Sequence, residues 1–283
     1  MQLIADTNVW YDIGATRRDP YMLKAGGQHR LVATPISILE IASLIDRYNL
    51  HERQTAAQAI LNYADEIAVD PESHLASLWN LPTPEQNVPW NDICKAIVQS
   101  SSTMELQKGV ADVNDRVFRK VNVSLAEAWR LYQWNDFKSK VDYVLNLDVP
   151  GYKAARRKGK IKHLNKKEGE NLSNRLKSIE VNKVIVKGTF CRALRVAGQP
   201  CRQPTDAEYA RTYPSIAPYV DAYTEYLIRC ATEYAPETND LGDLECFLYL
   251  QGHAALVSRD KRWGKIARKV CPAYYYDPDS ASI

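Results

Sequence analysis

Over the first fifty residues, short apolar runs alternate with segments whose apolar residues lie at helical spacing. Residues 2–5 form an apolar run typical of a buried strand, and the polar residues that follow have the character of a helix N-terminus. A second apolar run at residues 31–34 leads into Pro35, and Pro is favoured in the first turn of a helix. The order strand, helix, strand, helix predicts the start of an α/β fold.

The last fifty residues show the same alternation. Residues 239–252 have apolar positions at helical spacing and end in a Gly, so they predict a helix. Residues 254–258 predict a strand, and the apolar and aromatic residues 273–276 predict an edge strand. The two ends of the chain together predict a short, mostly parallel central sheet flanked by helices.

The middle of the chain, residues 49–236, has little strand character and predicts helices. Apolar residues lie at helical spacing in residues 123–147, and residues 50–67 are rich in Ala, Gln and Glu. The two terminal parts must meet in space to form one sheet. We therefore expect a discontinuous α/β domain, residues 1–48 and 237–283, with a largely helical insertion between its two parts.

Charge is distributed unevenly along the chain, although the whole sequence carries a net charge of only +3. Residues 151–202 contain nine Lys and six Arg against three Glu and no Asp, which gives +12, so the other residues sum to −9. A local basic block is the footprint expected for contacts with phosphate backbones, and an ordinary solvated loop is the alternative. Its densest part contains the candidate substrate-binding residues Arg156, Arg157, Lys158, Lys160 and Lys162.

The bulk composition predicts a folded protein without a membrane anchor. Hydrophobic residues make up 45% of the chain, enough for a sizeable core. No apolar stretch reaches the roughly 18 residues of a membrane helix, and the N-terminus has no signal-peptide pattern, so we expect a cytoplasmic protein. The six Cys are scattered with no C-x-x-C pair, which predicts mostly buried thiols and neither a zinc site nor a disulfide framework.

Four carboxylates lie at or near the ends of the apolar runs. Asp6 follows the first strand, and Glu40 lies in the helix after the second. Asp243 lies near the start of a later helix, and Asp260 follows the strand after it. Because parallel strands deliver their carboxyl ends to one edge of an open sheet, we expect these side chains to meet. Oxygen ligands suit Mg²⁺ or Mn²⁺, so the pattern predicts a divalent-metal site. Asp240 and Asp243 are both candidates for the third ligand, and we favour Asp243 from its distance to Asp260, with Asp240 as an auxiliary carboxylate.

These residues resemble the signature of the PIN-domain nucleases. In that family a short strand ends in Asp followed by Thr or Ser and Asn, as in Asp6-Thr7-Asn8 here, and a Glu follows in an early helix. The segment from Asp243 to Ser258-Arg259-Asp260 is similar to the family's final module, in which a helix and a strand separate an Asp from Thr/Ser-x-Asp. The resemblance covers residues 1–48 and 238–277 but not the middle, and a typical stand-alone PIN domain is much shorter than this chain.

The resemblance implies an endoribonuclease, dependent on Mg²⁺ or Mn²⁺, that hydrolyses phosphodiester bonds in RNA. The four carboxylates would be catalytic and would bind the metal, with help from Asp240. Asn8 and Ser258 would orient ligands or water. Lys261 and Arg262 would hold a phosphate. Such nucleases include toxins with a neutralising protein partner, defence nucleases and RNA-processing enzymes; the pattern does not decide among these, or whether the chain forms a homo-oligomer.

Two other functions remain open from the sequence. The first is a PIN-like fold without catalysis that binds nucleic acid or protein, although mutually repelling acids have no evident use in a scaffold. The second is a phosphatase of the haloacid-dehalogenase type, which generally needs a second Asp where this chain has Asn8. Each carboxylate also has a structural alternative, because Asp before a helix commonly serves as its N-cap.

Overall fold

The computed structural model describes most of the two ends of the chain and part of its middle. The described residues are 1–42, 49–83, 89–106, 108–109, 170–171, 174, 179–234 and 240–276. The strands are β1 (Gln2–Ala5), β2 (Arg30–Ala33), β3 (Glu66–Ile67), β4 (Ala254–Val257) and β5 (Tyr275–Tyr276). The α-helices are α1 (Thr7–Gly14), α2 (Pro20–Leu23), α3 (Pro35–Ala42), α4 (Leu50–Tyr63), α5 (Pro71–Leu78), α6 (Trp90–Gln99), α11 (Ile179–Val196), α12 (Asp206–Thr232), α13 (Asp240–Glu245) and α14 (Lys261–Val270). Short 3₁₀ helices are η1 (Ala25–Gly27), η2 (Cys246–Tyr249) and η3 (Pro272–Tyr274).

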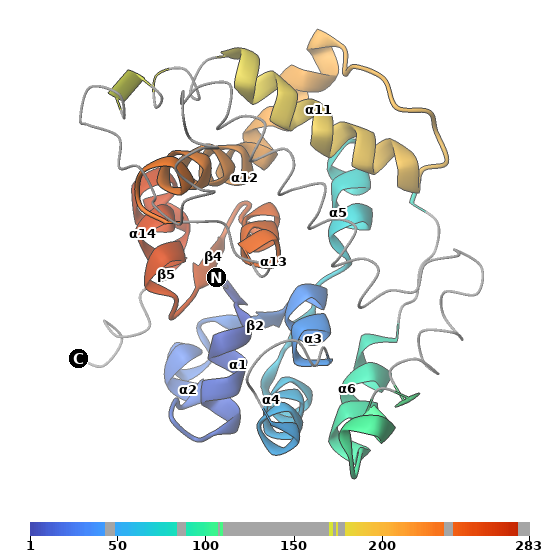
Figure 1. Cartoon of the computed structure of the whole chain (residues 1–283), viewed down its shortest axis with the longest axis vertical. Helices are drawn as coiled ribbons and strands as arrows, with labels where there is room; N and C mark the ends of the chain where they lie inside the picture. The colour runs from blue at the N-terminus through green and yellow to red at the C-terminus, as the bar shows by residue number, and fades with distance from the viewer. Residues whose placement is uncertain are drawn as a thin grey trace, which may run out of the picture.

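These strands form one parallel sheet in the order β3-β2-β1-β4-β5 (Figure 1). Strand β1 lies at the centre and pairs along its full length with β2 on one side and with β4 on the other. The two-residue strands β3 and β5 form the edges. The prediction of an α/β fold with a short parallel sheet is therefore confirmed, and so is the edge strand within residues 273–276.

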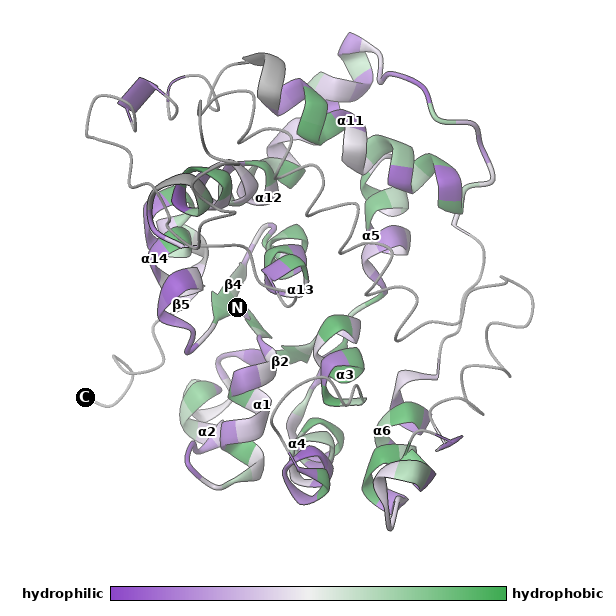
Figure 2. Ribbon diagram, in the orientation of Figure 1, coloured by the Kyte–Doolittle hydropathy of each residue, from purple (hydrophilic) through white to green (hydrophobic). Residues whose placement is uncertain are grey.

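Alternate side chains of the strands pack into two hydrophobic cores, one on each face of the sheet. Leu3 and Ala5 join the core that contains residues of α1, α3, α4 and α6. Ile4 joins the core that contains residues of α5, α11, α12 and α14. Successive residues of a strand point to opposite faces, and Figure 2 shows β2 and β4 in the green of hydrophobic residues. Helices thus cover both faces, as is usual for a parallel sheet.

Strand β3 lies inside a segment that the sequence predicts to be helical. Helix α4 ends at Tyr63, and β3 then pairs with β2. The prediction of a helix through residue 67 is wrong at its end, because a two-residue strand is too short to show a period-2 pattern. Helix α4 also packs closely on α1, where a Cβ on Gly14 would lie 2.5 Å from the carbonyl carbon of Thr55. Strand β3 is part of the sheet and α4 packs on α1, whereas the boundary of the insertion stays a prediction.

The helix predicted for residues 239–252 is divided into two elements. Helix α13 ends at Glu245, and η2 follows it and ends before Leu250. Asp240 and Asp243 both lie in the first turn of α13. The interruption does not move the following strand, since β4 occupies nearly the predicted residues.

Helix α12 is 27 residues long and opens with a capping box between Thr205 and Glu208, the pattern that these residues predict from the sequence. Neither α12 nor any other helix in the described ranges is long and apolar enough to cross a membrane. The helical pattern of residues 123–147 lies outside the described residues.

A partly buried ion-pair network connects α11 to the helix that carries Asp243. Arg192 on α11 donates hydrogen bonds to Glu245 at 2.6 and 2.7 Å and to Glu72 at 2.9 Å. Glu245 is fully buried at the end of α13. Burial raises the pKa of Glu245, and the charge of Arg192 opposes that change. The network therefore holds α13 against α5 and α11 from inside the core.

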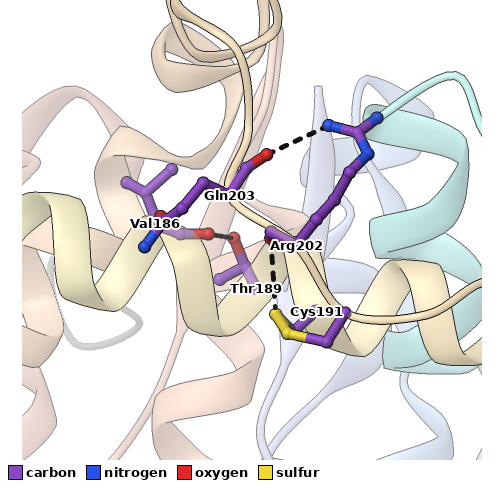
Figure 3. The surroundings of a disulfide bond; sticks show 6 residues. Val186, Thr189, Cys191, Arg202 and Gln203 are labelled. Carbon is purple, nitrogen blue, oxygen red and sulfur yellow. Dashed lines mark hydrogen bonds between the residues drawn. A yellow bond between two sulfur atoms is a disulfide. The ribbon is translucent and has the colours of Figure 1, made fainter.

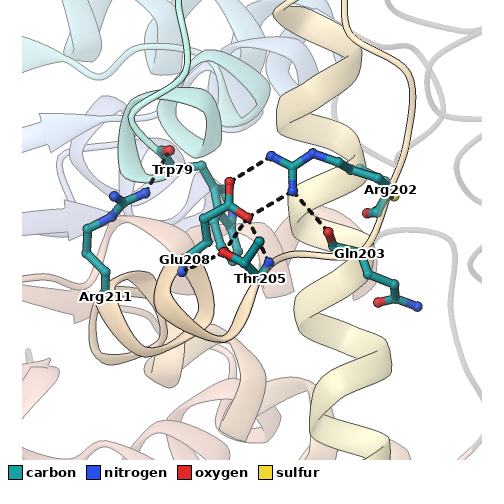
Figure 4. A network of polar contacts seen from close by, with 7 residues as sticks. Trp79, Arg202, Gln203, Thr205, Glu208 and Arg211 are labelled. Atoms are coloured by element: carbon teal, nitrogen blue, oxygen red, sulfur yellow. Dashed lines mark hydrogen bonds and ion pairs between the residues drawn. The ribbon is translucent and has the colours of Figure 1, made fainter.

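One disulfide joins Cys191 in α11 to Cys201 in the loop before α12 (Figure 3). The prediction of buried thiols is wrong for this pair, because two Cys ten residues apart form no recognisable motif. The other four Cys are buried free thiols, as predicted. Next to the disulfide, Arg202 donates two hydrogen bonds to the capping residue Glu208, at 2.9 and 2.7 Å (Figure 4). The end of α11 is thus tied to the start of α12.

Removing this disulfide is expected to lower the free energy of unfolding by about 2 kcal/mol, since the bond restricts a loop of roughly ten residues in the unfolded chain. The variant with both Cys191→Ser and Cys201→Ser tests this in urea unfolding. A reductant serves as the control, because it should destabilise the wild type by a similar amount and leave the variant unchanged. Equal unfolding midpoints for oxidised wild type and variant would contradict the prediction.

Candidate carboxylate site

Asp6 lies at the carboxyl end of β1, at the point where helix α1 begins. It is the N-cap of α1, and its Oδ1 accepts a hydrogen bond from the Val9 N–H at 3.0 Å. The Asp6 backbone N–H donates to the Val257 carbonyl of β4 at 3.0 Å, which fixes the residue between two strands. The capping role considered from the sequence is therefore real, but it uses only one carboxylate oxygen.

The second carboxylate oxygen of Asp6 is buried, unlike that of an ordinary N-cap residue at the protein surface. Asp6 is only 3% exposed, and Oδ2 is buried without a hydrogen bond of ordinary geometry from the described residues. Burial raises the pKa of Asp6 to about 7, helped by the charges of Glu40 and Asp260, while the nearby Ser258 hydroxyl and the Val9 N–H oppose the change. Near neutral pH this side chain therefore needs a positive partner to stay ionised.

Glu40 comes from α3, a helix whose residues are all buried. Its Oε2 accepts a hydrogen bond from the Thr7 hydroxyl, so the residue after Asp6 also serves the site. On its other side Glu40 lies against Gly242 of α13, where a Cβ would be 2.8 Å from Oε1. The absence of a side chain at Gly242 lets α13 approach the carboxylate.

Asp243 completes the link between the two terminal parts of the chain. Burial raises its pKa well above the ordinary value, and the charges of Glu40, Asp6 and Asp260 add to the change. The four predicted carboxylates therefore interact electrostatically, although they lie on four different elements or loops. Asp240, one turn before Asp243, contributes in the same direction.

Asp260 follows β4 and is the N-cap of α14. Its Oδ1 accepts from the Arg262 N–H at 2.7 Å, and its own N–H donates to the Ser258 hydroxyl at 3.0 Å. Ser258 is buried and lies close enough to Asp6 to affect its pKa. Ser258 thus stands between two of the carboxylates, which is the position expected for a group that orients them.

The remaining predicted residues have different surroundings. Lys261 is exposed, and Asn8 is partly exposed in the first turn of α1. The guanidinium group of Arg262 forms ion pairs with Asp240 at 3.3 Å and with Asp260 at 3.2 Å. The basic residues predicted to bind substrate lie outside the described residues; they are Arg156, Arg157, Lys158, Lys160 and Lys162.

Two partners of the site were not predicted from the sequence. Thr7 holds Glu40, and the Tyr226 hydroxyl of α12 donates to Asp240 at 2.8 Å. The only sequence signal for Thr7 was its place inside the Asp6-Thr7-Asn8 motif. Tyr226 lies 14 residues before Asp240 across a helix end, so no local pattern connects them.

The chemistry of the donor set suits a hard divalent cation. Asp6 offers a buried oxygen without a hydrogen bond, and every candidate ligand is a carboxylate, the ligand type of Mg²⁺ and Mn²⁺. Within the described ranges, no group of three or more His, Cys, Asp or Glu side chains is arranged closely enough to hold a metal ion without rearrangement.

The place of these residues in the fold agrees with a binding function. From the central strand β1 the chain continues through β2 to β3 on one side of the sheet, and later through β4 to β5 on the other side. The point between β1 and β4 is therefore a topological switch point, and ligands of open α/β sheets bind there, outside the carboxyl ends of the strands. Asp6 and Asp260 follow the carboxyl ends of these two strands. Comparisons with protein-family models, with curated proteins and with solved structures found no match. Any functional assignment therefore depends on the residues and their geometry.

Substituting Gly242 by Ala is expected to displace the Glu40 carboxylate, because the new Cβ would lie 2.8 Å from Glu40 Oε1 and 3.1 Å from Ile36 Cγ2. We expect a loss of about 1 kcal/mol in the free energy of unfolding, despite the better helix propensity of Ala. Gly188→Ala in α11 is the matched control, since its added Cβ meets nothing within 4 Å. Equal effects of the two substitutions in urea unfolding would rule out this close approach.

Proposed function

We propose that this protein is a metal-dependent nuclease of the PIN type that hydrolyses phosphodiester bonds in RNA. The supporting observation is the convergence of Asp6, Glu40, Asp243 and Asp260: burial raises the pKa values of Asp6 and Asp243, and the charges of the neighbouring carboxylates add to the change. Because these carboxylates come from separate elements, local helix capping does not account for their meeting. Mg²⁺ or Mn²⁺ is the proposed cofactor.

The electrostatics of the site favour the binding of a cation. Each buried carboxylate loses hydration, and each ionised neighbour adds repulsion. A divalent ion held by Asp6, Glu40, Asp243 and Asp260 would offset both costs. Bound there, it would supply a Lewis acid that lowers the pKa of water and stabilises the leaving oxygen.

The protein's own groups have definite proposed roles. Thr7 orients Glu40, and Ser258 orients Asp6 and Asp260, so that their oxygens face the same region. Exposed Lys261 holds a phosphate of the substrate near this region. The basic segment within residues 151–202 contacts phosphates farther along the RNA.

The biological setting is also part of the proposal. The cytoplasmic location is the one expected from the sequence composition. A neutralising protein partner and a role as a toxin, a defence nuclease or an RNA-processing enzyme come from the resemblance described above. Association between copies of the chain is left open.

The second candidate is a catalytically inactive module that binds nucleic acid or protein. One observation favours it: Asp6 and Asp260 both cap helices, and Arg262 pairs with Asp240 and Asp260, so part of the acidic cluster is neutralised by the protein itself. This candidate predicts RNA or protein binding without any metal-dependent chemistry.

A defined substrate distinguishes the two candidates. Labelled single-stranded oligoribonucleotide and its deoxy counterpart are incubated with the wild-type protein in Mg²⁺, Mn²⁺ or EDTA. We expect RNA cleavage with either metal, no cleavage in EDTA, and much slower cleavage of DNA. Cleavage that persists in EDTA would contradict the metal-dependent mechanism, and metal-independent binding without cleavage would favour the inactive module.

A further inference from the structure

Arg262 bridges two carboxylates at the acidic edge of the sheet. One guanidinium nitrogen lies 3.3 Å from Asp240 Oδ1, and another lies 3.2 Å from Asp260 Oδ2. The Arg262 backbone N–H donates to the second oxygen of Asp260 at 2.7 Å. The side chain of Arg262 is 29% exposed, whereas that of Asp240 is fully buried. The arginine therefore reaches inward from the surface to a charge that has no solvent contact.

The surroundings hold this arrangement in place. The other oxygen of Asp240 accepts a hydrogen bond from the Tyr226 hydroxyl at 2.8 Å. The Tyr226 ring stacks on Trp263, the residue after Arg262, with ring centres 5.5 Å apart and planes at 11°. The guanidinium group also lies over the Tyr234 ring, 5.6 Å from its centre. Oδ2 of Asp240 is thus hydrogen-bonded to Tyr226, and Oδ1 lies within ion-pair distance of Arg262.

We propose that Arg262 is a built-in counter-ion of the acidic site, and that Asp240 positions this arginine instead of binding the metal. In the metal-free protein the guanidinium group neutralises Asp260 and occupies part of the region that a divalent ion would use. A divalent ion at the site would compete with Arg262 for Asp260, while Arg262 would stay anchored to Asp240 beside the site, where it could face a phosphate. The part of this inference that concerns the metal rests on the proposed function.

The planar fork of Arg suits this role better than Lys does. A guanidinium group offers several N–H donors in a fixed geometry and can serve two carboxylates at once, whereas an ammonium group acts as a point charge. The counter-ion competes with the metal, because both stabilise the same charge on Asp260. Its removal should therefore strengthen metal binding, which is the opposite of what loss of a ligand or of a purely structural contact would cause.

Binding of Mn²⁺ without RNA tests the competition, with the free ion measured by electron paramagnetic resonance. Arg262→Met should bind Mn²⁺ at least about tenfold more tightly than the wild type, since a unit charge near a divalent ion is removed from a partly buried site. Lys265→Met is the control, because Lys265 is an exposed cation on the same helix and its loss should change binding less than about twofold. Unchanged or weaker binding by Arg262→Met would overturn the inference.

The double variant Asp240→Asn with Arg262→Met shows whether Asp240 positions Arg262 or binds the metal ion. If Asp240 only positions Arg262, removing both leaves the metal ligands intact, and Mn²⁺ should bind at least as tightly as it does to the wild type. If Asp240 is a ligand, the double variant should bind at least about tenfold more weakly than Arg262→Met, and weaker than the wild type, which would overturn the assignment.

Unfolding in EDTA tests the counter-ion without any metal. Arg262→Met and Asp240→Asn should each lower the urea midpoint, and the double variant should lose less than the sum of the two, because neither charge is left without its partner. Additive losses would overturn the inference. If neither the wild type nor Arg262→Met binds Mn²⁺, the proposed function and the competition both fail, and coupling in EDTA still decides whether Asp240 and Arg262 form the counter-ion pair.

Discussion

Substituting Asp6 by Asn is expected to reduce metal-dependent RNA cleavage at least about a hundredfold while the protein stays folded. Asn keeps the size of the side chain and one oxygen, so the cap of α1 can still accept from the Val9 N–H. It removes the negative charge at the buried Oδ2, which the proposed ion needs most. Loss of activity without loss of structure would identify this carboxylate as part of the reaction.

The control for this prediction is Asp92→Asn. Asp92 is exposed on α6 and pairs with Lys95 on the same helix, so it carries the same charge change away from the site. Initial cleavage rates, urea unfolding and RNA binding are measured for all three proteins. Cleavage by Asp6→Asn at the rate of Asp92→Asn would show that Asp6 only caps a helix.

The metal-free protein is expected to be less stable at pH 8 than at pH 5. Burial raises the pKa of Asp6 from 3.8 to about 7, so between these values the folded state holds a proton that the unfolded state has lost. The free energy of unfolding therefore falls as the pH rises through this window. Each pH unit in the window corresponds to about 1.4 kcal/mol, and roughly two units of the window lie above pH 5, so Asp6 alone accounts for a loss of roughly 3 kcal/mol between pH 5 and pH 8.

Asp243 acts in the same direction, since its pKa is also raised by burial and by the neighbouring carboxylates. Urea unfolding in EDTA from pH 5 to pH 8.5 measures the effect. Asp6→Asn should show a flatter profile than the wild type and should be the more stable protein at pH 8, whereas Asp92→Asn should follow the wild type. Mg²⁺ should restore wild-type stability at pH 8. Parallel profiles for wild type and Asp6→Asn would contradict the burial of an ionisable carboxylate.

The parts of the fold that were predictable are those with strong local patterns. Strand β1 is an apolar run that ends in Asp6, and its boundaries agree with the prediction. Glu40 is predicted to lie in the helix after the second apolar run, and the structure places it in α3, whose residues are all buried. The positions of such residues are visible in the sequence because the apolar pattern of a single strand or helix marks them.

The parts that were missed depend on contacts between distant residues. Strand β3 is defined by its pairing with β2 and not by its own two residues. The disulfide between Cys191 and Cys201 depends on how the chain turns after α11. The ion pair of Arg262 with Asp240 joins residues 22 positions apart on two helices, and the predicted contact of Arg262 with a phosphate stays a prediction. Tertiary packing, and not local pattern, sets each of these.

The most direct test of the proposed nuclease compares wild type and Asp6→Asn on a mixed pool of cellular RNA, with fragment ends mapped in Mg²⁺, in Mn²⁺ and in EDTA. The proposal predicts new RNA ends at defined positions for the wild type with either metal, and none for Asp6→Asn or in EDTA. If wild type and Asp6→Asn give the same ends, or if the wild type binds RNA and gives none with any metal, the metal-dependent nuclease is excluded.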